Sequence, residues 1–254
     1  TDIAKSMQVQ ALSRQEKVLE LTHDLSKDKV LKYLRQFPIE YLNHYQAEDI
    51  SWHARNILRF TNSEAPLILF SQKPNVGTEL MVYYKSNTPM VFGNIARTMA
   101  IKQLNVFSAQ VFITHNFHAL CTIMFQNKKG MPLDHDRLNN LRKAIIAGLD
   151  DHSQTLDISA STRQIFEIPT KISFLENMSK KQTNLEISTL DRQGLLAKIG
   201  ITLGSLDCLI RAARITTTGE RADDFFAITD VNGLPLAPSK KEELSAALKA
   251  ALDG

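Results

Sequence analysis

Cysteine is scarce in this sequence, with only Cys121 and Cys208 among 254 residues. Both lie in apolar surroundings, so we expect two small buried thiols in a reducing compartment, and no disulfide framework. No apolar run reaches the about 18 residues that a membrane-spanning helix needs, and no signal-peptide pattern is present. These features argue against a disulfide-rich secreted domain and a membrane protein, and we expect a cytoplasmic protein.

An excess of charge of one sign is also missing. The sequence has 30 Lys and Arg residues against 27 Asp and Glu, which leaves a net charge of +3. With 43% hydrophobic and 22% charged residues, the composition is that of an ordinary globular protein. The small and scattered positive excess gives no reason to expect a nucleic-acid partner. The length allows about two domains.

The motifs of common catalytic sites are missing as well. There is no Walker loop, no G-x-S-x-G and no evident pairing of cysteine with histidine. Nucleotidyl transfer needs a Gly-Ser turn followed by Asp-x-Asp to hold Mg²⁺, but Gly204-Ser205 lies within a predicted helix. His23, and His115 with His118, lack the further ligands that a metal site needs. We therefore expect no catalytic residue and no metal site in this chain.

The most informative stretch runs from Thr183 to Leu236. Residues 185–189 alternate between apolar and polar, which predicts a half-buried strand, and apolar residues then recur at helical spacing up to Leu206. Two runs rich in β-branched residues follow at 209–218 and 222–231, before an Asn-Gly turn and a last helical segment. Strand, helix, strand, strand, helix is the start of a ferredoxin-like α+β layer.

Chemistry is expected in the loop between that strand and helix, residues 190–194. Asp191 could pair with an ammonium group, and Gly194 lets the backbone approach a ligand closely. The first N–H groups of the helix suit a carboxylate, so that the combination fits an α-amino acid. The alternative, which spacing alone favours, is that Asp191 caps the helix and Gly194 eases a tight turn.

The loop sequence LDRQGLL at 190–196 resembles the D-R-P-G-L-L loop of ACT domains, which bind amino acids and regulate enzymes. More narrowly, DRQGLLAKI and ARITTTGERADDFFAITDVNGLPL resemble the second ACT domain of the bacterial PII uridylyltransferase/uridylyl-removing enzyme family. Gln193 departs from the usual Pro, and Leu209 stands where ACT domains often carry Asn, which weakens this copy's half of a site. The resemblance implies ligand contacts by Asp191, Arg192, Gln193, Gly194 and Leu195.

The same order of elements occurs about 105 residues earlier, and N-x-x-G-M-P-L from Asn127 echoes the later N-G-L-P-L. We therefore predict an α+β fold with two tandem ferredoxin-like ACT domains, each βαββαβ, after a helical region. The predicted elements of the first copy are strand 78–85, helix 90–102, strands 106–114 and 120–125, and helix 134–149.

The first copy lacks the loop signature. Where the family has D-R-P-G, this chain has Asn87-Thr88-Pro89-Met90, so Asn87 offers no carboxylate and Met90 carries a Cβ in place of Gly. Asn105 nevertheless fits the position at the start of the second strand where ACT domains often place Asn. Because ACT ligands commonly bind between paired domains, the resemblance implies one composite site in which Asp191–Leu195 face Asn105. The alternative is that Asn105 is a turn residue.

Residues 1–60 carry helical apolar stripes. Within them, a Y-x-x-x-x-x-x-E-x-I-x-W-H pattern from Tyr41 to His53 resembles the linker that follows the hydrolase domain in the same family. We expect Trp52 to anchor packing and His53 to cap or pack.

These features predict three parts: a helical linker over 1–60, a first ACT domain over 61–176 and a second over 177–254. The segment 163–176 contains a strand interrupted by Pro169. It is expected either to complete the first sheet or, through residues 171–175, to form the edge of the second.

The function that the resemblance implies is regulatory. L-glutamine would be the effector, favouring removal of uridylyl groups from the PII signal protein, which the full-length enzyme would contact, whereas low glutamine would favour their addition. ACT–ACT pairing within or between chains is expected, without nucleic-acid or membrane partners. No cofactor is expected in this chain, although Mg²⁺ is expected for the transferase and hydrolase domains that the family carries N-terminal to the linker.

Two alternatives remain open. The first is a stand-alone double-ACT regulator or the regulatory tail of an amino-acid biosynthetic enzyme, against which the Tyr41–His53 pattern argues. The second is RNA binding, because an RNA-recognition motif shares the βαββαβ order. Such a motif needs stacking aromatics with basic neighbours on its third strand. Here that strand offers acidic Asp223-Asp224 before its two phenylalanines.

Overall fold

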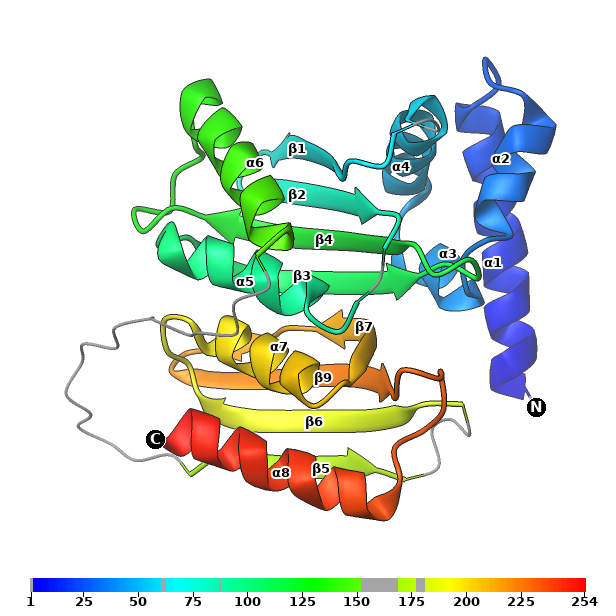
Figure 1. Cartoon of the computed structure of the whole chain (residues 1–254). Coiled ribbons are helices and arrows are strands. Elements are labelled where there is room, and N and C mark those ends of the chain that lie inside the picture. Colours follow the sequence, from blue (N-terminus) through cyan, green and yellow to red (C-terminus); the bar gives the residue numbers. More distant parts are fainter. Residues whose placement is uncertain (1, 61–62, 87, 152–168, 177–180) are drawn as a thin grey trace. The chain divides into compact units, whose positions relative to one another are not determined.

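A computed structural model of the chain describes residues 2–60, 63–86, 88–151, 169–176 and 181–254 (Figure 1). Contacts divide the chain into two compact units. Unit 1 comprises Thr1–Leu67, Val82–Ser86 and Phe112–Leu120, and unit 2 comprises Ile68–Met81, Asn87–Val111 and Cys121–Gly254. The three-part division of the chain stays a prediction.

Among the described residues before the first strand, 2–60 and 63–66, four helices are found, in agreement with the helical prediction for the N-terminal region. They are α1 (Asp2–Leu21), α2 (Lys27–Leu34), α3 (Ile39–His44) and α4 (Ala47–Arg59).

Two antiparallel sheets follow, and each is accompanied by two helices (Figure 1). The first has the strand order β1-β2-β4-β3 and the second has the order β5-β6-β9-β7, with β8 paired to β9. The first set consists of β1 (Leu67–Lys73), β2 (Gly77–Tyr84), α5 (Val91–Ile101), β3 (Asn105–Ile113), β4 (Ala119–Gln126) and α6 (His135–Leu149). The second consists of β5 (Lys171–Leu175), β6 (Thr183–Leu190), α7 (Leu195–Ser205), β7 (Leu209–Arg214), β8 (Thr217–Thr218), β9 (Arg221–Thr229) and α8 (Pro238–Asp253).

The tandem ferredoxin-like α+β fold predicted from the sequence is confirmed, with one correction to its strand order. In both copies the fourth strand precedes the βαββα core in the chain: β1 lies beside β2, and β5 lies beside β6. Lys171–Leu175 pair with Asn184–Ser188, so this strand belongs to the second sheet, which is the second of the two placements expected for it. Neighbouring antiparallel strands pair readily when a short connection joins them, as happens here. Residues 163–168 of the predicted segment lie outside the described residues.

Along strands β6 and β9 of the second sheet, buried and more exposed side chains alternate. Leu185 and Ile187 of β6 are fully buried, as is Phe226 of β9, because successive side chains of a strand point to opposite faces. Helix α8 contributes Leu244, Leu248 and Leu252, which are spaced by four residues and buried as one stripe. This alternation fixes which side chains of β6 and β9 point inward.

Helices α5 and α7, both in unit 2, pack against each other through small residues. A Cβ on Gly200 would lie 2.8 Å from the Cα of Gly93, and a Cβ on Gly93 would lie 2.8 Å from the carbonyl carbon of Gly200. Ala96, Ala100 and Ala197 form a buried cluster at the same interface. The backbones of the two helices therefore approach as closely as glycine permits.

The core of unit 1 is aromatic. Phe37 stacks on Tyr41 with ring centroids 4.1 Å apart, while Tyr33 and Tyr45 meet Tyr41 edge to face. The buried Tyr41 hydroxyl lies 2.9 Å from the Tyr33 hydroxyl and 2.9 Å from His53 Nδ1. His53 therefore packs in the core, as expected, and burial raises the pKa values of both tyrosines.

Tyr41→Phe is expected to destabilise unit 1 by about 1–3 kcal/mol, because it removes a hydrogen-bond partner from two buried polar side chains while retaining the ring. Urea unfolding monitored by tyrosine and tryptophan fluorescence measures the loss. An unchanged unfolding midpoint would show that the hydroxyl network contributes nothing.

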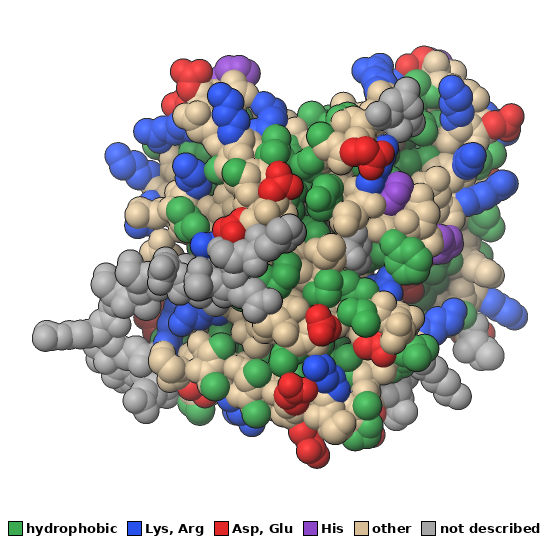
Figure 2. Space-filling model, in the orientation of Figure 1, with side chains coloured by type: hydrophobic (Ala, Val, Ile, Leu, Met, Phe, Trp, Pro, Cys, Tyr) green, Lys and Arg blue, Asp and Glu red, His purple; other side chains and the backbone are tan. Residues whose placement is uncertain are grey.

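Both cysteine side chains are free and buried, as predicted. Burial raises the pKa of Cys121 to about 12 and that of Cys208 to about 11, so neither thiol is a ready nucleophile near neutral pH. Both positive and negative side chains are scattered over the visible face (Figure 2). Within the described part of the chain, no helix is both long and apolar enough to cross a membrane.

Candidate functional site

The loop that leaves β6 leads into helix α7 through a glycine with a left-handed backbone conformation. Gly194 is the N-cap of α7 and has a φ of +81°, a conformation that favours glycine, and no side chain caps the helix. Asp191 instead donates its backbone N–H to the Glu220 carbonyl oxygen, at 2.8 Å. The alternative in which Asp191 caps the helix is therefore wrong, and its carboxylate is available for another role.

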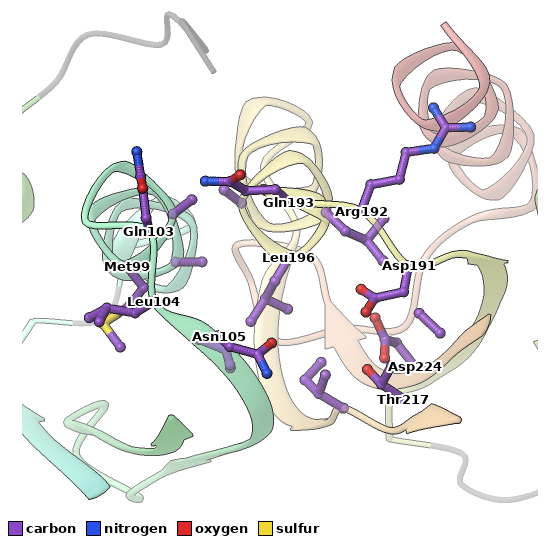
Figure 3. A pocket seen from close by; sticks show the side chains of 18 of the residues that line it. Met99, Gln103, Leu104, Asn105, Asp191, Arg192, Gln193, Leu196, Thr217 and Asp224 are labelled. Carbon is purple, nitrogen blue, oxygen red and sulfur yellow. The ribbon is translucent and has the colours of Figure 1, made fainter. Parts of the chain in front are cut away.

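This loop borders a cavity of about 230 Å³ within unit 2 (Figure 3). One wall comes from α5 and the start of β3, and the other from the loop, the start of α7 and strands β8 and β9. All six residues predicted to contact a ligand line this cavity: Asn105, Asp191, Arg192, Gln193, Gly194 and Leu195. Of the first copy's loop signature, Asn87 lies outside the described residues.

The lining side chains take different directions (Figure 3). The carboxyl groups of Asp191 and Asp224 face each other, whereas the Arg192 side chain extends away from them. Asn105 directs its amide toward the middle of the cavity, and Gln193 extends toward α5. The cavity therefore has an acidic end and an amide-bearing wall.

Asp224 is a lining residue that sequence reasoning missed. It is only 2% exposed, and its Oδ1 accepts a hydrogen bond from the Thr216 backbone N–H at 3.3 Å. Burial, with smaller contributions from the Asp191 and Asp223 charges, raises its pKa to about 7. The signal was the alternation of Ala222, Asp224 and Phe226, which places this carboxylate on the inner face of β9.

The two carboxyl groups together favour a cationic ligand group. Burial also raises the pKa of Asp191, although this residue lies at the exposed rim. A carboxylate held in such surroundings gains most when an opposite charge comes within about 4–6 Å, as an ammonium group would. Perturbed carboxyl groups in a cavity are a recognised sign of a functional site.

The described residues of this cavity do not suggest a metal ion as the cationic ligand. Within the described residues, no group of three or more His, Cys, Asp or Glu side chains is arranged to hold a metal ion. The acidic end of the cavity offers two carboxylates, and the remaining lining is apolar or amide apart from Thr217 and the basic residues Lys128 and Arg192.

Comparison with known proteins gives a consistent set of relatives. No family model matches the sequence. The chain is 32% identical over 213 residues to the bifunctional uridylyltransferase/uridylyl-removing enzyme of Vibrio campbellii, and 34% identical over 218 residues to that of Aliivibrio fischeri. These matches cover 83% and 84% of this chain but only 24% and 25% of the relatives, so the chain spans about a quarter of their length.

Among solved structures, aspartate kinase from Synechocystis aligns with a TM-score of 0.39 at 12% identity. The alignment covers 68% of this chain and 26% of that one.

Proposed function

Because the chain is a relative of one region of the bifunctional uridylyltransferase/uridylyl-removing enzymes, we propose that it is the effector-sensing region of such an enzyme. The effector that we propose is L-glutamine. Bound glutamine would favour removal of uridylyl groups from a PII signal protein, and its absence would favour their addition. The PII protein would be contacted by the full-length enzyme.

The composite cavity is the observation that carries this proposal. A site assembled from both copies responds to how α5 and α7 are packed, so occupancy is linked to the arrangement of the two copies. A ligand that bridges two elements stabilises the arrangement to which it binds best. Regulation by a small molecule requires such differential affinity.

The lining suits glutamine group by group. Asp191 and Asp224 would receive the α-ammonium group, and the first-turn N–H groups of α7 would receive the carboxylate. The amide of Asn105 can both donate to and accept from a side-chain amide, which glutamate lacks. A volume of about 230 Å³ lies below the usual range of about 300–1,000 Å³ for drug-sized ligands, and fits a free amino acid better.

Calorimetric titration with L-glutamine tests the proposal. We expect about one glutamine per chain. Asp191→Ala should weaken binding by about 10- to 100-fold, since a charge-assisted hydrogen bond contributes about 1.5–3 kcal/mol. Asn105→Ala should weaken binding as well, because Asn105 is the residue that the first copy contributes to the composite site.

Asp136→Ala is the matched control, because Asp136 is an exposed acid in the first turn of α6 and does not line the cavity. Two glutamines per chain, or equal loss in the Asp136→Ala control, would contradict the composite site. Tighter binding of an amino acid without a side-chain amide would instead favour the regulator of another biosynthetic enzyme.

A further inference from the structure

Unit 1 contains a second cavity, of about 720 Å³, that the proposed glutamine site does not use. It is bordered by α2, the end of α4, the end of β2 and the turn between β3 and β4. Its volume falls within the range of about 300–1,000 Å³ that is usual for small-molecule sites. All of its lining residues belong to unit 1.

Positive charge converges on this cavity. Lys29 and Lys32 lie one turn apart on α2, on the same helix face, and Lys85 enters from the end of β2. Among the described lining residues, Glu64 is the one acid. Its carboxylate lies 3.7 Å from Lys85 Nζ, but its side chain is 93% exposed, whereas that of Lys85 is 20% exposed. With three lysines against one solvent-exposed acid, the lining has a net charge of about +2.

A network of polar side chains contributes further hydrogen-bonding groups to the cavity lining. Asn116 accepts a hydrogen bond from Thr114 Oγ1 at 2.6 Å, and its Nδ2 lies 3.4 Å from His118 Nε2. In the tautomer in which His118 Nε2 accepts from Asn116, the imidazole proton is on Nδ1, which lies 2.6 Å from the Tyr83 hydroxyl oxygen. In that tautomer the Tyr83 hydroxyl hydrogen can be donated to a ligand, because Tyr83 lines the cavity.

The pKa of the His118 imidazole is affected by Lys85, which lines the same cavity. Burial, followed by the positive charge of Lys85, lowers the pKa of His118. A neutral His118 is therefore expected at pH 7, and an anion entering beside it would relieve the repulsion among the cations. Figure 2 shows Lys and Arg side chains to be frequent on the visible face of the part that carries α2 and α4.

We propose that this cavity binds a small phosphate-bearing molecule, whose anionic oxygens are held by Lys29, Lys32 and Lys85 with the Tyr83 hydroxyl as a neutral donor. Lysine ammonium groups are effective phosphate ligands as point charges. The lining residues Ile57, Leu58 and Phe60, at the end of α4, are apolar and suit an organic substituent on the phosphate. This site is independent of the proposed glutamine site.

Binding of inorganic pyrophosphate to the whole chain tests this proposal, by calorimetry at an ionic strength matched with sodium chloride. We expect saturable binding at one site, which Lys29→Gln combined with Lys32→Gln weakens by at least about 10-fold, because two of the three cationic partners are lost. Lys27→Gln is the matched control: Lys27 is an exposed lysine of the same helix that does not line the cavity, and binding should be unchanged.

A nucleoside diphosphate in place of pyrophosphate identifies the organic part. Tighter binding of the nucleotide would show that the apolar wall takes part, and equal affinity would show that only the phosphates are recognised. No binding of either compound beyond the sodium chloride control, or equal losses in the Lys27→Gln control, would overturn the proposal. Asp191→Ala should bind pyrophosphate as the unmodified chain does, which separates this result from the glutamine test.

Discussion

Gly200→Leu is expected to force α5 and α7 apart and to abolish effector binding even where the two sheets remain folded. A side chain at Gly200 would begin 2.8 Å from the Cα and 3.1 Å from the N of Gly93. Both neighbours are backbone atoms, so no rotamer change relieves the clash. Overpacking of this kind costs about 1–3 kcal/mol, and the large leucine side chain should reach the upper end.

The effect on binding should exceed the effect on stability. The composite cavity takes one wall from α5 and β3 and the other from the loop and α7, so that separating the helices separates its walls. Thermal unfolding and glutamine titration on the same variant measure the two effects. Ser205→Ala, at an exposed position of the same helix, is the control and should change neither.

The partner glycine supplies a stricter test. Gly93→Ala should destabilise the chain for the same reason as Gly200→Ala, since each added Cβ meets the other helix backbone. The double variant should cost less than the sum of the two single variants, because the first substitution already moves the helices apart. Additive costs would show that the two glycines do not share one contact.

The order of elements was readable from the sequence because each element carries its own periodicity. Alternation marked β6, helical spacing marked α7, and the Asp134 side chain caps α6 by accepting a hydrogen bond from the Arg137 N–H. The sheet to which β5 belongs could not be predicted in the same way. The alternation of Lys171, Ile172, Ser173 and Phe174 indicates a strand, but it does not indicate which of the two sheets the strand joins.

Part of the candidate site could be predicted from the sequence. Asp191 and Gly194 stand in a recognisable loop, and Asn105 stands at a recognisable strand start, so that their residue types pointed to one ligand. Asp224 was hidden because two adjacent acids suggest a solvated surface, while burial on β9 is set by the tertiary alternation. The close approach of α5 and α7 was hidden as well, although glycine within a helix is costly enough to indicate a packing reason.

Asp224→Asn is expected to raise the stability of the chain above pH 7 while weakening effector binding. The native pKa of Asp224 is about 7, against 3.8 for an ordinary aspartate. Because the folded state holds this proton more tightly than the unfolded state, stability falls as pH rises from about 4 to 7, and the penalty is fully present above pH 7. Asparagine carries no charge and keeps the acceptor for the Thr216 N–H.

The expected gain is on the order of 2–4 kcal/mol at pH 8 and close to zero at pH 4, since one unit of pKa shift corresponds to about 1.4 kcal/mol. Urea unfolding across this pH range measures it. Asp223→Asn is the matched control, because the neighbouring carboxylate is half exposed and pairs with Arg221 at 2.9 Å. A pH-independent difference between Asp224→Asn and the unmodified chain would show that the carboxyl group is not perturbed by folding.

The opposite signs of the two effects distinguish a ligand residue from a structural one. If Asp224 only made a structural hydrogen bond, Asp224→Asn would change the free energy of unfolding and the affinity for the effector in the same direction. If the carboxylate serves the ammonium group of the effector, its removal stabilises the empty chain and costs affinity. Binding at pH 7 should then also release a proton, because an ammonium group lowers the pKa of the carboxyl that it meets. Calorimetry in buffers of different ionisation enthalpy detects that proton, and Asp224→Asn should release less of it.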